Sequence, residues 1–474
     1  MRPPAVSSLG CAGCGAPAPP PEIDSFAFRC AQAARGDRRY HIIARTLDTS
    51  RVDWPSDRAV NPFVRYRRLL HSWHVARAQG LSDEWFVGLV EHVSAQVATV
   101  DDRRFAVTPC ASSEALATAL AWGSAGRIWV KDETGQVSGS HKARHLMGVM
   151  LYLRVVEQLG LASARARLAI ASCGNAALAA AVVARAADRP LDVFVPPWAH
   201  PAVTGRLRTL GAVLHVCERQ TGHSGDPCYQ GFLGAVDQGA VPFCVQGPAN
   251  GLTIDGGETL GFEIADAVRD HGGLDAIVVQ VGGGALASAC NQAMDEAHRL
   301  GAVMRRPRLY TVQTRGGYPL KRCYDRVVDA IARALGDAEL AAMNEADRAA
   351  TLAATLATPR HADLVTSVLR DAAAHPADFM WPWETEPRSV ATGILDDETY
   401  DWLAVVDGML RTGGFPLVVS EEELEGANDL ARRTTGIDVD HTGSAGLAGL
   451  TQLRAMDPRL ANEHVAVLFT GVRR

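Results

Sequence analysis

Short apolar runs alternate with helical patterns along most of this chain, and this alternation restricts the fold more than any other feature of the sequence. From about residue 105 onward, Ala/Leu-rich stretches with helical periodicity separate short β-rich runs. The runs are RIWVKDE (127–133), ARLAIASC (166–173), LDVFVP (191–196), AVLHVC (212–217), DAIVVQVGGG (275–284), RLYTVQT (308–314) and HVAVLFTG (464–471). Continuous apolar strands between helices are typical of parallel sheets covered on both faces. We therefore predict an α/β fold.

A first glycine-rich turn, VVQVGGGALASACNQAM (278–294), follows one of these strands. Ligands of such sheets bind at the carboxyl ends of strands, and Gly282, Gly283 and Gly284 allow backbone N–H groups to converge on an anion at a helix start. The turn matches neither GxGxxG nor GxxxxGK[ST], which disfavours a dinucleotide or a nucleoside triphosphate. A tight turn with nothing bound remains an alternative.

A second turn, IASCGNAALAAAV (170–182), places Asn175 between a strand and a helix. Exposed N–H groups at this position can hold a carboxylate, although an Asn/Gly turn that only caps the helix is equally compatible. Cys173 has no His partner that the sequence reveals, so we expect it to be a small packed side chain.

The third turn, SGSHKARH (138–145), contains one of only three lysines, Lys131, Lys142 and Lys321, so that 47 − 3 = 44 of the 47 basic residues are Arg. Lys142 stands at the predicted start of a helix, whose positive end is unfavourable for a cation. Unlike Arg, Lys can lose its proton, attack a carbonyl and form a Schiff base. A solvated lysine at a helix start is the alternative.

Taken in order, these motifs resemble those of the fold-type II pyridoxal-phosphate enzymes, which include threonine synthase, threonine and serine dehydratases, cysteine synthase and the tryptophan synthase β chain. Thr108-Pro109 followed by VKDETGQVSGSHKARH is similar to the family's TPL…KxExxxxxGSxKxR segment. SCGNAALAAA, GGETLGFEI (256–264), VGGGALAS and VLFTG resemble four further motifs. The resemblance covers roughly residues 105–474 and implies two open, mostly parallel twisted sheets flanked by helices.

The resemblance also implies roles for individual residues around pyridoxal 5′-phosphate (PLP). Lys142 would form the Schiff base and remove the Cα proton of the substrate. The remaining cofactor contacts would come from Gly282, Gly283 and Gly284 at the phosphate, His141 also at the phosphate, Asn175 at the ring O3′ and Thr470 at the pyridine nitrogen. A hydroxyl at the nitrogen does not force the ring to be cationic, which suits elimination and replacement. The substrate carboxylate would bind the loop of Ser172, Gly174, Asn175 and Ala176.

Departures from the family pattern leave the substrate open. His141 stands where threonine synthases and dehydratases usually have Phe, and resembles the tryptophan synthase β chain instead. Ala143 replaces a common acid, and the glycine loop has three glycines where four are frequent. His441 occurs where Pro is common. Glu258 and Thr259 match the family without an assigned role. Arg144 is a candidate for binding a substrate phosphate.

The resemblance divides the chain into three parts. Residues 1–50 form an N-terminal CxxC-containing extension, and residues 51–104 form a helical segment that we expect to pack on the large domain. Residues 105–474 form the PLP catalytic unit, with a small mobile subdomain around 140–245 and the large domain from the remainder.

The N-terminal extension contains CAGCG, with Cys11 and Cys14, and then Cys30. A structural zinc site requires four ligands, and His41 is poorly spaced as a fourth. We therefore expect no metal, with a zinc site formed by Cys11, Cys14 and Cys30 as the alternative.

Composition excludes several other function classes. The net charge of −6 provides no basic field for nucleic acid. The start of the chain lacks a charged region followed by an apolar one, and the most apolar run (168–184) contains Gly174 and Asn175, which disfavours a membrane span. Scattered cysteines suit a reducing cytoplasm. We thus expect a cytoplasmic protein, a homodimer like its relatives, with neither a nucleic-acid nor a membrane partner.

The leading functional hypothesis is a PLP-dependent lyase or synthase that removes the Cα proton of a small amino acid and eliminates or replaces its β- or γ-substituent, as threonine synthases and dehydratases do. Two alternatives remain: a β-replacement synthase of the cysteine synthase or tryptophan synthase β type, and a PLP-binding protein without turnover. The sequence does not distinguish which amino acid is used.

Overall fold

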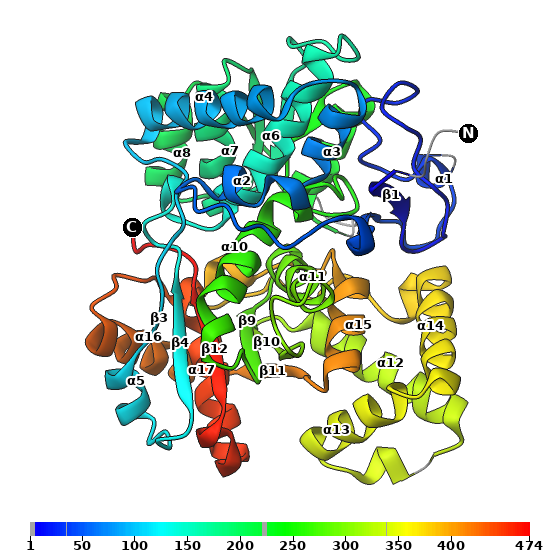
Figure 1. Cartoon of the computed structure of the whole chain (residues 1–474), viewed down its shortest axis with the longest axis vertical. Coiled ribbons are helices and arrows are strands. Elements are labelled where there is room, and N and C mark those ends of the chain that lie inside the picture. Colours follow the sequence, from blue (N-terminus) through cyan, green and yellow to red (C-terminus); the bar gives the residue numbers. More distant parts are fainter. Residues whose placement is uncertain (1–4, 35, 220–224, 338) are drawn as a thin grey trace. The chain divides into compact units, whose positions relative to one another are not determined.

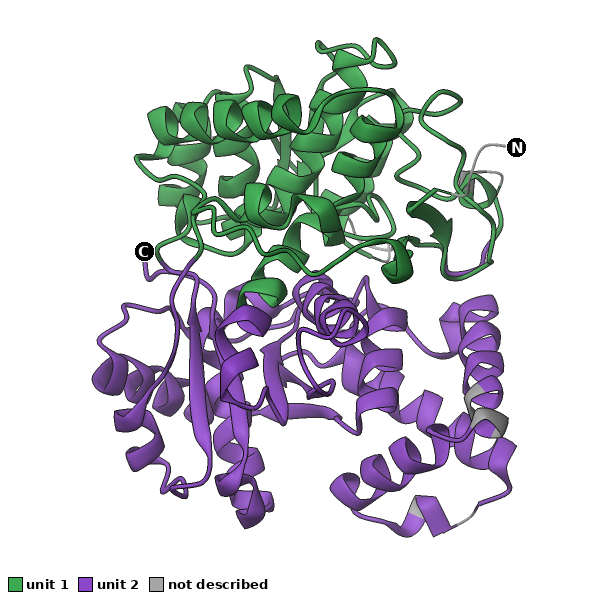
Figure 2. Cartoon of the chain, in the orientation of Figure 1, with its two compact units in different colours: residues 1–37, 41–107, 135–263 green, residues 38–40, 108–134, 264–474 purple. Residues whose placement is uncertain are grey.

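The computed structural model describes residues 5–34, 36–219, 225–337 and 339–474, which form two compact units (Figure 2). Unit 1 comprises residues 1–37, 41–107 and 135–263, and unit 2 comprises residues 38–40, 108–134 and 264–474. Among the described residues, no helix has both the length and the apolar character that crossing a membrane requires.

A four-stranded parallel sheet with the order β7-β6-β5-β8 forms the centre of unit 1. Its strands are β5 (Leu168–Ala171), β6 (Leu191–Val195), β7 (Val213–Val216) and β8 (Val241–Pro242). Every residue of β5 and β6 is buried, as expected for strands covered on both faces. The helices that alternate with these strands are α6 (Lys142–Gln158), α7 (Asn175–Ala186), α8 (Pro201–Thr209), α9 (Pro227–Asp237) and α10 (Thr253–Val268), the last belonging to unit 1 through Glu263.

The N-terminal part of unit 1 begins with the antiparallel pair β1 (Ser7–Cys11) and β2 (Ile43–Leu47), with α1 (Ala31–Ala34) between them in sequence. Helices α2 (Pro62–Arg65), α3 (His71–Ala78) and α4 (Asp83–Asp101) follow, together with the short 3-10 turns η1 (Thr49–Arg51) and η2 (Arg67–Leu69). The chain breaks between α3 and α4, where Gly80 has a φ of +85° and the Ser82 side chain caps α4 at Trp85 N.

The helical segment 51–104 packs within unit 1. Helix α3 contacts α6, and α4 contacts α7 (Figure 1). Phe63, Phe86 and Val90 share one buried apolar cluster with residues of α6 and α7. The segment therefore belongs to the unit that contains residues 140–245 rather than to the large sheet of unit 2. The mobility proposed for residues 140–245 stays a prediction.

Unit 2 is built on a six-stranded sheet with the order β11-β10-β9-β12-β4-β3, in which only the β3–β4 pair is antiparallel. The strands are β3 (Cys110–Ser112), β4 (Arg127–Asp132), β9 (Ala276–Gln280), β10 (Arg308–Thr314), β11 (Pro416–Val419) and β12 (His464–Phe469). The helices are α5 (Glu114–Ala119), α11 (Ala285–Arg299), α12 (Pro319–Leu335), α13 (Glu345–Leu356), α14 (Pro359–Ala374), α15 (Trp402–Thr412), α16 (Glu421–Thr435) and α17 (His441–Met456). Two mostly parallel sheets with flanking helices confirm the predicted fold class.

Candidate functional site

Lys142 is the first residue of α6, and a tightly wound loop leads into it. The preceding 3-10 turn η3 (Val137–Gly139) contains Ser138 at a φ of +56° and Gly139 at a φ of +71°. A non-glycine residue at positive φ is held there against its own preference, and Ser138 N–H is anchored 2.6 Å from Asp101 Oδ2. Ser140 is fully buried, and its Oγ has no hydrogen-bond partner among the described residues. The loop thus fixes the position of the half-buried Lys142. The buried Ser140 hydroxyl can serve a ligand.

His145 lies one turn after Lys142 and is an uncharged side chain. Its Nδ1 is 2.8 Å from the carbonyl oxygen of Thr253, so this nitrogen carries the proton and donates it. Burial, and to a smaller extent the charge of Lys142, lower the His145 pKa to about 3. His145 therefore stays neutral at physiological pH, and its ring lies edge-on to the ring of His141, with 5.8 Å between centroids.

Arg144 does not have the role that the sequence suggested. Its Nη1 and Nη2 donate to the two carboxylate oxygens of Glu263 over 2.6 and 3.0 Å, and Nη1 also reaches Thr259 Oγ1 at 3.1 Å. Arg144 and Glu263 are both buried, so this bidentate pair ties α6 to α10. The charge of Arg144 is used inside the fold rather than offered to a substrate phosphate.

The Ser172–Ala176 loop lies at the carboxyl end of β5 and leads into α7. Gly174 precedes the helix without a side-chain cap, and Asn175 is its first residue. Ser172, Gly174 and Asn175 are half-buried, and space for a Cβ at Gly174 is open. An uncapped helix start with accessible N–H groups suits a carboxylate. Because η3 packs against α7, unit 1 brings the Lys142 loop and this helix together.

In unit 2, the glycine loop connects the carboxyl end of β9 to α11. Gly284 has a φ of +98° and offers no side-chain cap to the helix. A Cβ on Gly282 would lie 2.9 Å from Ile394 Cα, and one on Gly283 would lie 2.9 Å from the Tyr400 ring. Only glycine fits these positions, because a larger residue would collide with the chain at residues 394–400. The uncapped helix start favours an anion, whereas the Asp396 carboxylate beside Gly282 opposes one.

Thr470 follows β12, the sheet neighbour of β9, and a residue that the sequence reasoning missed fixes its hydroxyl. Gln280 Nε2 donates to Thr470 Oγ1 over 2.7 Å and is 2.9 Å from the carbonyl oxygen of Gly443. Thr470 therefore accepts from Gln280 and can direct its own proton toward a ring nitrogen. The available signal was a polar residue at the end of an otherwise apolar strand, AIVVQ.

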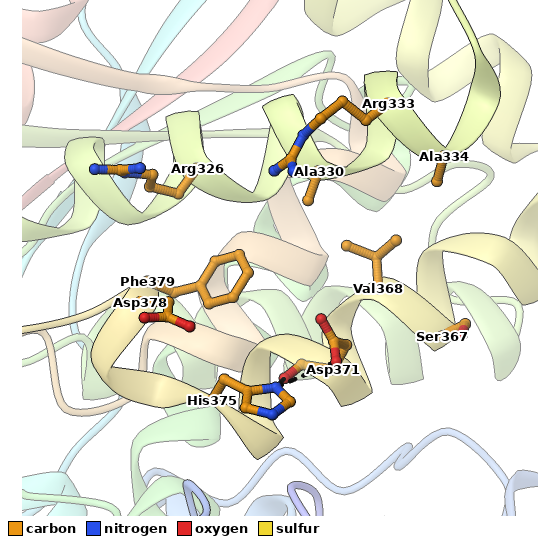
Figure 3. A pocket seen from close by; sticks show the side chains of 10 residues that line it. All are labelled: Arg326, Ala330, Arg333, Ala334, Ser367, Val368, Asp371, His375, Asp378 and Phe379. Atoms are coloured by element: carbon orange, nitrogen blue, oxygen red, sulfur yellow. Dashed lines mark hydrogen bonds and ion pairs between the residues drawn. The ribbon is translucent and has the colours of Figure 1, made fainter.

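A cavity of about 580 Å³ in unit 2 contains none of the predicted site residues (Figure 3). Side chains of α12 and α14 line it, including Arg326, Arg333 and the pair His375–Asp371, whose Nδ1 and Oδ1 are 3.2 Å apart. These polar groups face solvent or one another, so the cavity supports no functional assignment.

Comparisons with known proteins agree with this arrangement. L-serine dehydratase of Saccharomyces cerevisiae is 27% identical over 178 residues, which is 36% of this chain and 52% of the yeast protein. Threonine synthase of Methanosarcina acetivorans is 23% identical over 354 residues, 73% of this chain and 70% of that protein. The chain thus spans about half the length of the yeast relative that it matches.

Solved structures share the fold at lower identity. Serine racemase from maize superposes with a TM-score of 0.54 at 15% identity, covering 81% of this chain and 92% of that one. Threonine deaminase isoform 2 from Solanum lycopersicum gives a TM-score of 0.53 at 14% identity, covering 84% and 92%. The family model described as "Pyridoxal-phosphate dependent enzyme" matches residues 103–355, more than half of the chain. The chain therefore belongs to the family of pyridoxal-phosphate dependent enzymes, and its cofactor is pyridoxal 5′-phosphate.

Proposed function

We propose that this protein is a PLP-dependent lyase or synthase that acts on a small amino acid. The observation that carries the proposal is the position of Lys142, on a strained, anchored loop at the start of α6. The open anion-binding start of α7 belongs to the same unit. The family match and the names of the serine dehydratase and threonine synthase relatives support the reaction class.

Each predicted residue has a defined task in this proposal. Lys142 Nζ holds the cofactor covalently and, once released, carries the Cα proton of the substrate. The N–H groups of Gly282–Gly284 bind the phosphate, aided by His141, and Asn175 contacts O3′. The Ser172–Ala176 loop binds the substrate carboxylate, and the Thr470 hydroxyl meets the ring nitrogen. When bound, the cofactor supplies an electron sink for negative charge at Cα.

The neutral state of His145 supports the base role of Lys142. A second positive charge one turn away would raise the cost of carrying a proton on Lys142 Nζ. Because His145 is uncharged and buried, it adds no positive charge to that of the α6 N-terminus beside Lys142. The amine can then accept and return a proton without competition from a neighbouring imidazolium.

Two reaction outcomes follow from loss of the Cα proton. In the dehydratase outcome, serine or threonine loses water across Cα–Cβ, and hydrolysis then yields a keto acid and ammonia. In the synthase outcome, either a γ-substituent such as phosphate leaves and water adds at Cβ, or a β-substituent leaves and another nucleophile takes its place at Cβ. A second candidate function is β-replacement of the cysteine synthase or tryptophan synthase β type. The buried His141 next to Lys142 favours it.

A spectral titration of the purified protein tests the proposal. Serine, threonine, O-phosphohomoserine and O-acetylserine are added in parallel, and products are identified by mass spectrometry. A changed cofactor spectrum with keto acid and ammonia supports the dehydratase outcome, and threonine from O-phosphohomoserine supports the synthase outcome. Bound cofactor without a spectral change for any amino acid would show a protein without turnover.

We also propose a homodimer in the cytoplasm. Relatives in this family are commonly dimers, and none of the ten cysteines, all of which lie in the described residues, forms a disulfide in the structure, as suits a reducing compartment. Light scattering of the purified holoenzyme measures the mass, which should be twice that of the chain.

A further inference from the structure

Four potential metal ligands that are far apart in sequence meet at one point of unit 1. The Sγ atoms of Cys11, Cys14 and Cys30 and a ring nitrogen of His41 all lie within 4.8 Å of one another. Cys11 Sγ is 3.4 Å from His41 Nδ1, and Cys14 Sγ is 3.6 Å from Cys30 Sγ. Cys11, Cys30 and His41 are buried, and Cys14 is half-buried.

The two shortest of these separations match edges of a zinc tetrahedron. With Zn–S bonds of about 2.3 Å and Zn–N bonds of about 2.0–2.1 Å, tetrahedral angles place two sulfurs about 3.8 Å apart and a sulfur and a nitrogen about 3.6 Å apart. The observed 3.6 and 3.4 Å are within a few tenths of an ångström of both values. Three thiols and an imidazole also form a known ligand set for structural zinc.

Local backbone structure explains how the ligands come together. Cys11 ends β1 and begins a tight knuckle, in which Gly15 N–H donates to Cys11 O over 2.8 Å and Gly15 has a φ of +75°. Ala12 N–H donates to Ile42 O over 2.9 Å, which ties the knuckle to the chain beside His41. Cys30 immediately precedes α1. The β1–β2 pairing thereby closes a loop that spacing in the sequence does not reveal.

A carboxylate lies near the second ring nitrogen of the histidine, as is common beside metal-bound imidazoles. Nδ1 of His41 faces Cys11, whereas its Nε2 lies 3.5 Å from Asp37 Oδ2. A ligating histidine typically donates its second ring N–H to a carboxylate, which fixes the tautomer and leaves the other nitrogen as the ligand.

We propose that Cys11, Cys14, Cys30 and His41 bind one zinc ion in a closed structural site. The proposal departs from the expectation that the chain holds no metal. Four protein ligands leave no open coordination position, so the ion supports the fold and takes no part in catalysis. It would hold together the β1 knuckle, the start of α1 and the entry to β2, a small region whose apolar cluster contains little besides Cys11, Cys30 and Ile43.

The site has a structural route to α6. Strand β2 carries Arg45, which pairs with Asp255 at 2.8 Å and with Glu258, both on α10. Helix α10 in turn contacts α6 through Glu263 and Arg144 and through Thr253 and His145. Loss of zinc should therefore loosen β2 first and reduce the support of α10 on that side. Glu258, which matched a family motif without a role, is part of this connection.

Metal analysis tests the proposal directly. The holoenzyme is purified without chelators and analysed by inductively coupled plasma mass spectrometry, with about one zinc per chain as the expected result. The single variants Cys11→Ser, Cys14→Ser and Cys30→Ser should lose most of the metal. Cys110→Ser and Cys217→Ser, which change partly exposed cysteines outside the cluster, should retain it.

A second measurement uses only the wild-type chain, so it does not depend on the folding of any variant. Thiol alkylation under native conditions, read by peptide mass spectrometry, should leave Cys11, Cys14 and Cys30 protected until a zinc chelator is added. Cys110 and Cys217 should react at the same rate with and without it. Less than about one tenth of a zinc per chain in wild type after reconstitution with ZnCl₂, a Cys14–Cys30 disulfide, or equal alkylation with and without chelator would overturn the proposal.

Discussion

Gln280 donates a hydrogen bond from its side-chain amide to the hydroxyl of Thr470 over 2.7 Å, across two neighbouring strands of the large sheet. The same amide reaches the carbonyl oxygens of Gly443 and Leu468 at 2.9 and 3.3 Å. The amide has two N–H groups, which these three acceptors share, and the contact fixes the position of the Thr470 hydroxyl.

Replacing Gln280 by Leu should lower the stability of the protein by about 1–3 kcal/mol, because buried acceptors lose their donor. Differential scanning calorimetry of the cofactor-free protein measures the change. Gln452→Leu is the control, since its amide makes one bond of 3.4 Å from a half-buried position and its loss should change the melting temperature far less. Equal melting temperatures for Gln280→Leu and wild type would contradict the assignment.

Replacing one partner of the Arg144–Glu263 pair should destabilise the protein more than replacing both. Arg144→Met alone leaves Glu263 charged and buried, which costs about 3–5 kcal/mol. The double variant Arg144→Met/Glu263→Leu should recover much of this loss, as measured by a double-mutant cycle in urea.

The exposed pair Arg299–Asp295, with side chains 49% and 34% exposed, is the matched control for that cycle. Its coupling should stay below about 1 kcal/mol. If Arg144 and Glu263 show coupling no larger than this exposed pair, the buried ion pair does not connect α6 with α10 as described.

Helices α6 and α10 approach so closely that a methyl group at Gly256 has no room. A Cβ there would lie 2.3 Å from the Arg144 carbonyl oxygen and 2.9 Å from Gly148 Cα. Gly256→Ala should therefore destabilise the protein by about 1–3 kcal/mol. Gly88→Ala, in helix α4 with no atom within 4 Å of the new Cβ, should instead stabilise it by about 0.5–1 kcal/mol. Thermal melts that move both variants in the same direction would refute this account of the packing.

Because His145 is neutral in the folded protein, we expect the stability of the protein to fall in acid. Its pKa is about 3 in the folded protein against a reference value of 6.5. Between these values the unfolded chain binds a proton that the folded chain does not, so stability is complete above pH 6.5 and falls as the pH drops toward 3. At about pH 5 the loss from this group should be about 2 kcal/mol.

His145→Asn isolates that contribution, because the Asn amide can replace the Nδ1 donor to Thr253 but does not titrate. Urea unfolding at about pH 7.5 and pH 5 should show a smaller loss for this variant than for wild type. The same loss in both proteins would mean that His145 is not the titrating group.

How far the sequence predicts the fold depends on the kind of interaction involved. The long strands β4, β5, β9, β10 and β12 were recognisable because their apolar runs are continuous, whereas β8 is only two residues, Val241 and Pro242, and has no periodicity to detect. The segment 51–104 was recognisable as helical, but periodicity carries no information about which part of the chain such a segment packs on.

Among the site residues, those at local features could be predicted from the sequence, and those defined by distant contacts could not. Lys142, Asn175 and the glycine loop stand at strand–helix junctions, which are local features. The partners Gln280, Glu263 and Arg45 depend on contacts between residues more than 100 positions apart in sequence. His41 meets Cys11, which is 30 residues away, through the pairing of two strands. Such contacts follow from the packed fold and have no local signature.

The central claim is that Lys142 binds the cofactor covalently, and the chain offers only two other lysines for comparison. Lys131 is fully buried and donates to Thr108 O over 2.9 Å, and Lys321 is paired with Asp325 at 2.7 Å. The holoenzyme is reduced with sodium borohydride, digested and mapped by mass spectrometry. The account predicts a phosphopyridoxyl group on the Lys142 peptide of wild type and none on any peptide of Lys142→Arg. A label on Lys131 or Lys321 in wild type, or a reducible cofactor band that persists in Lys142→Arg, would contradict it.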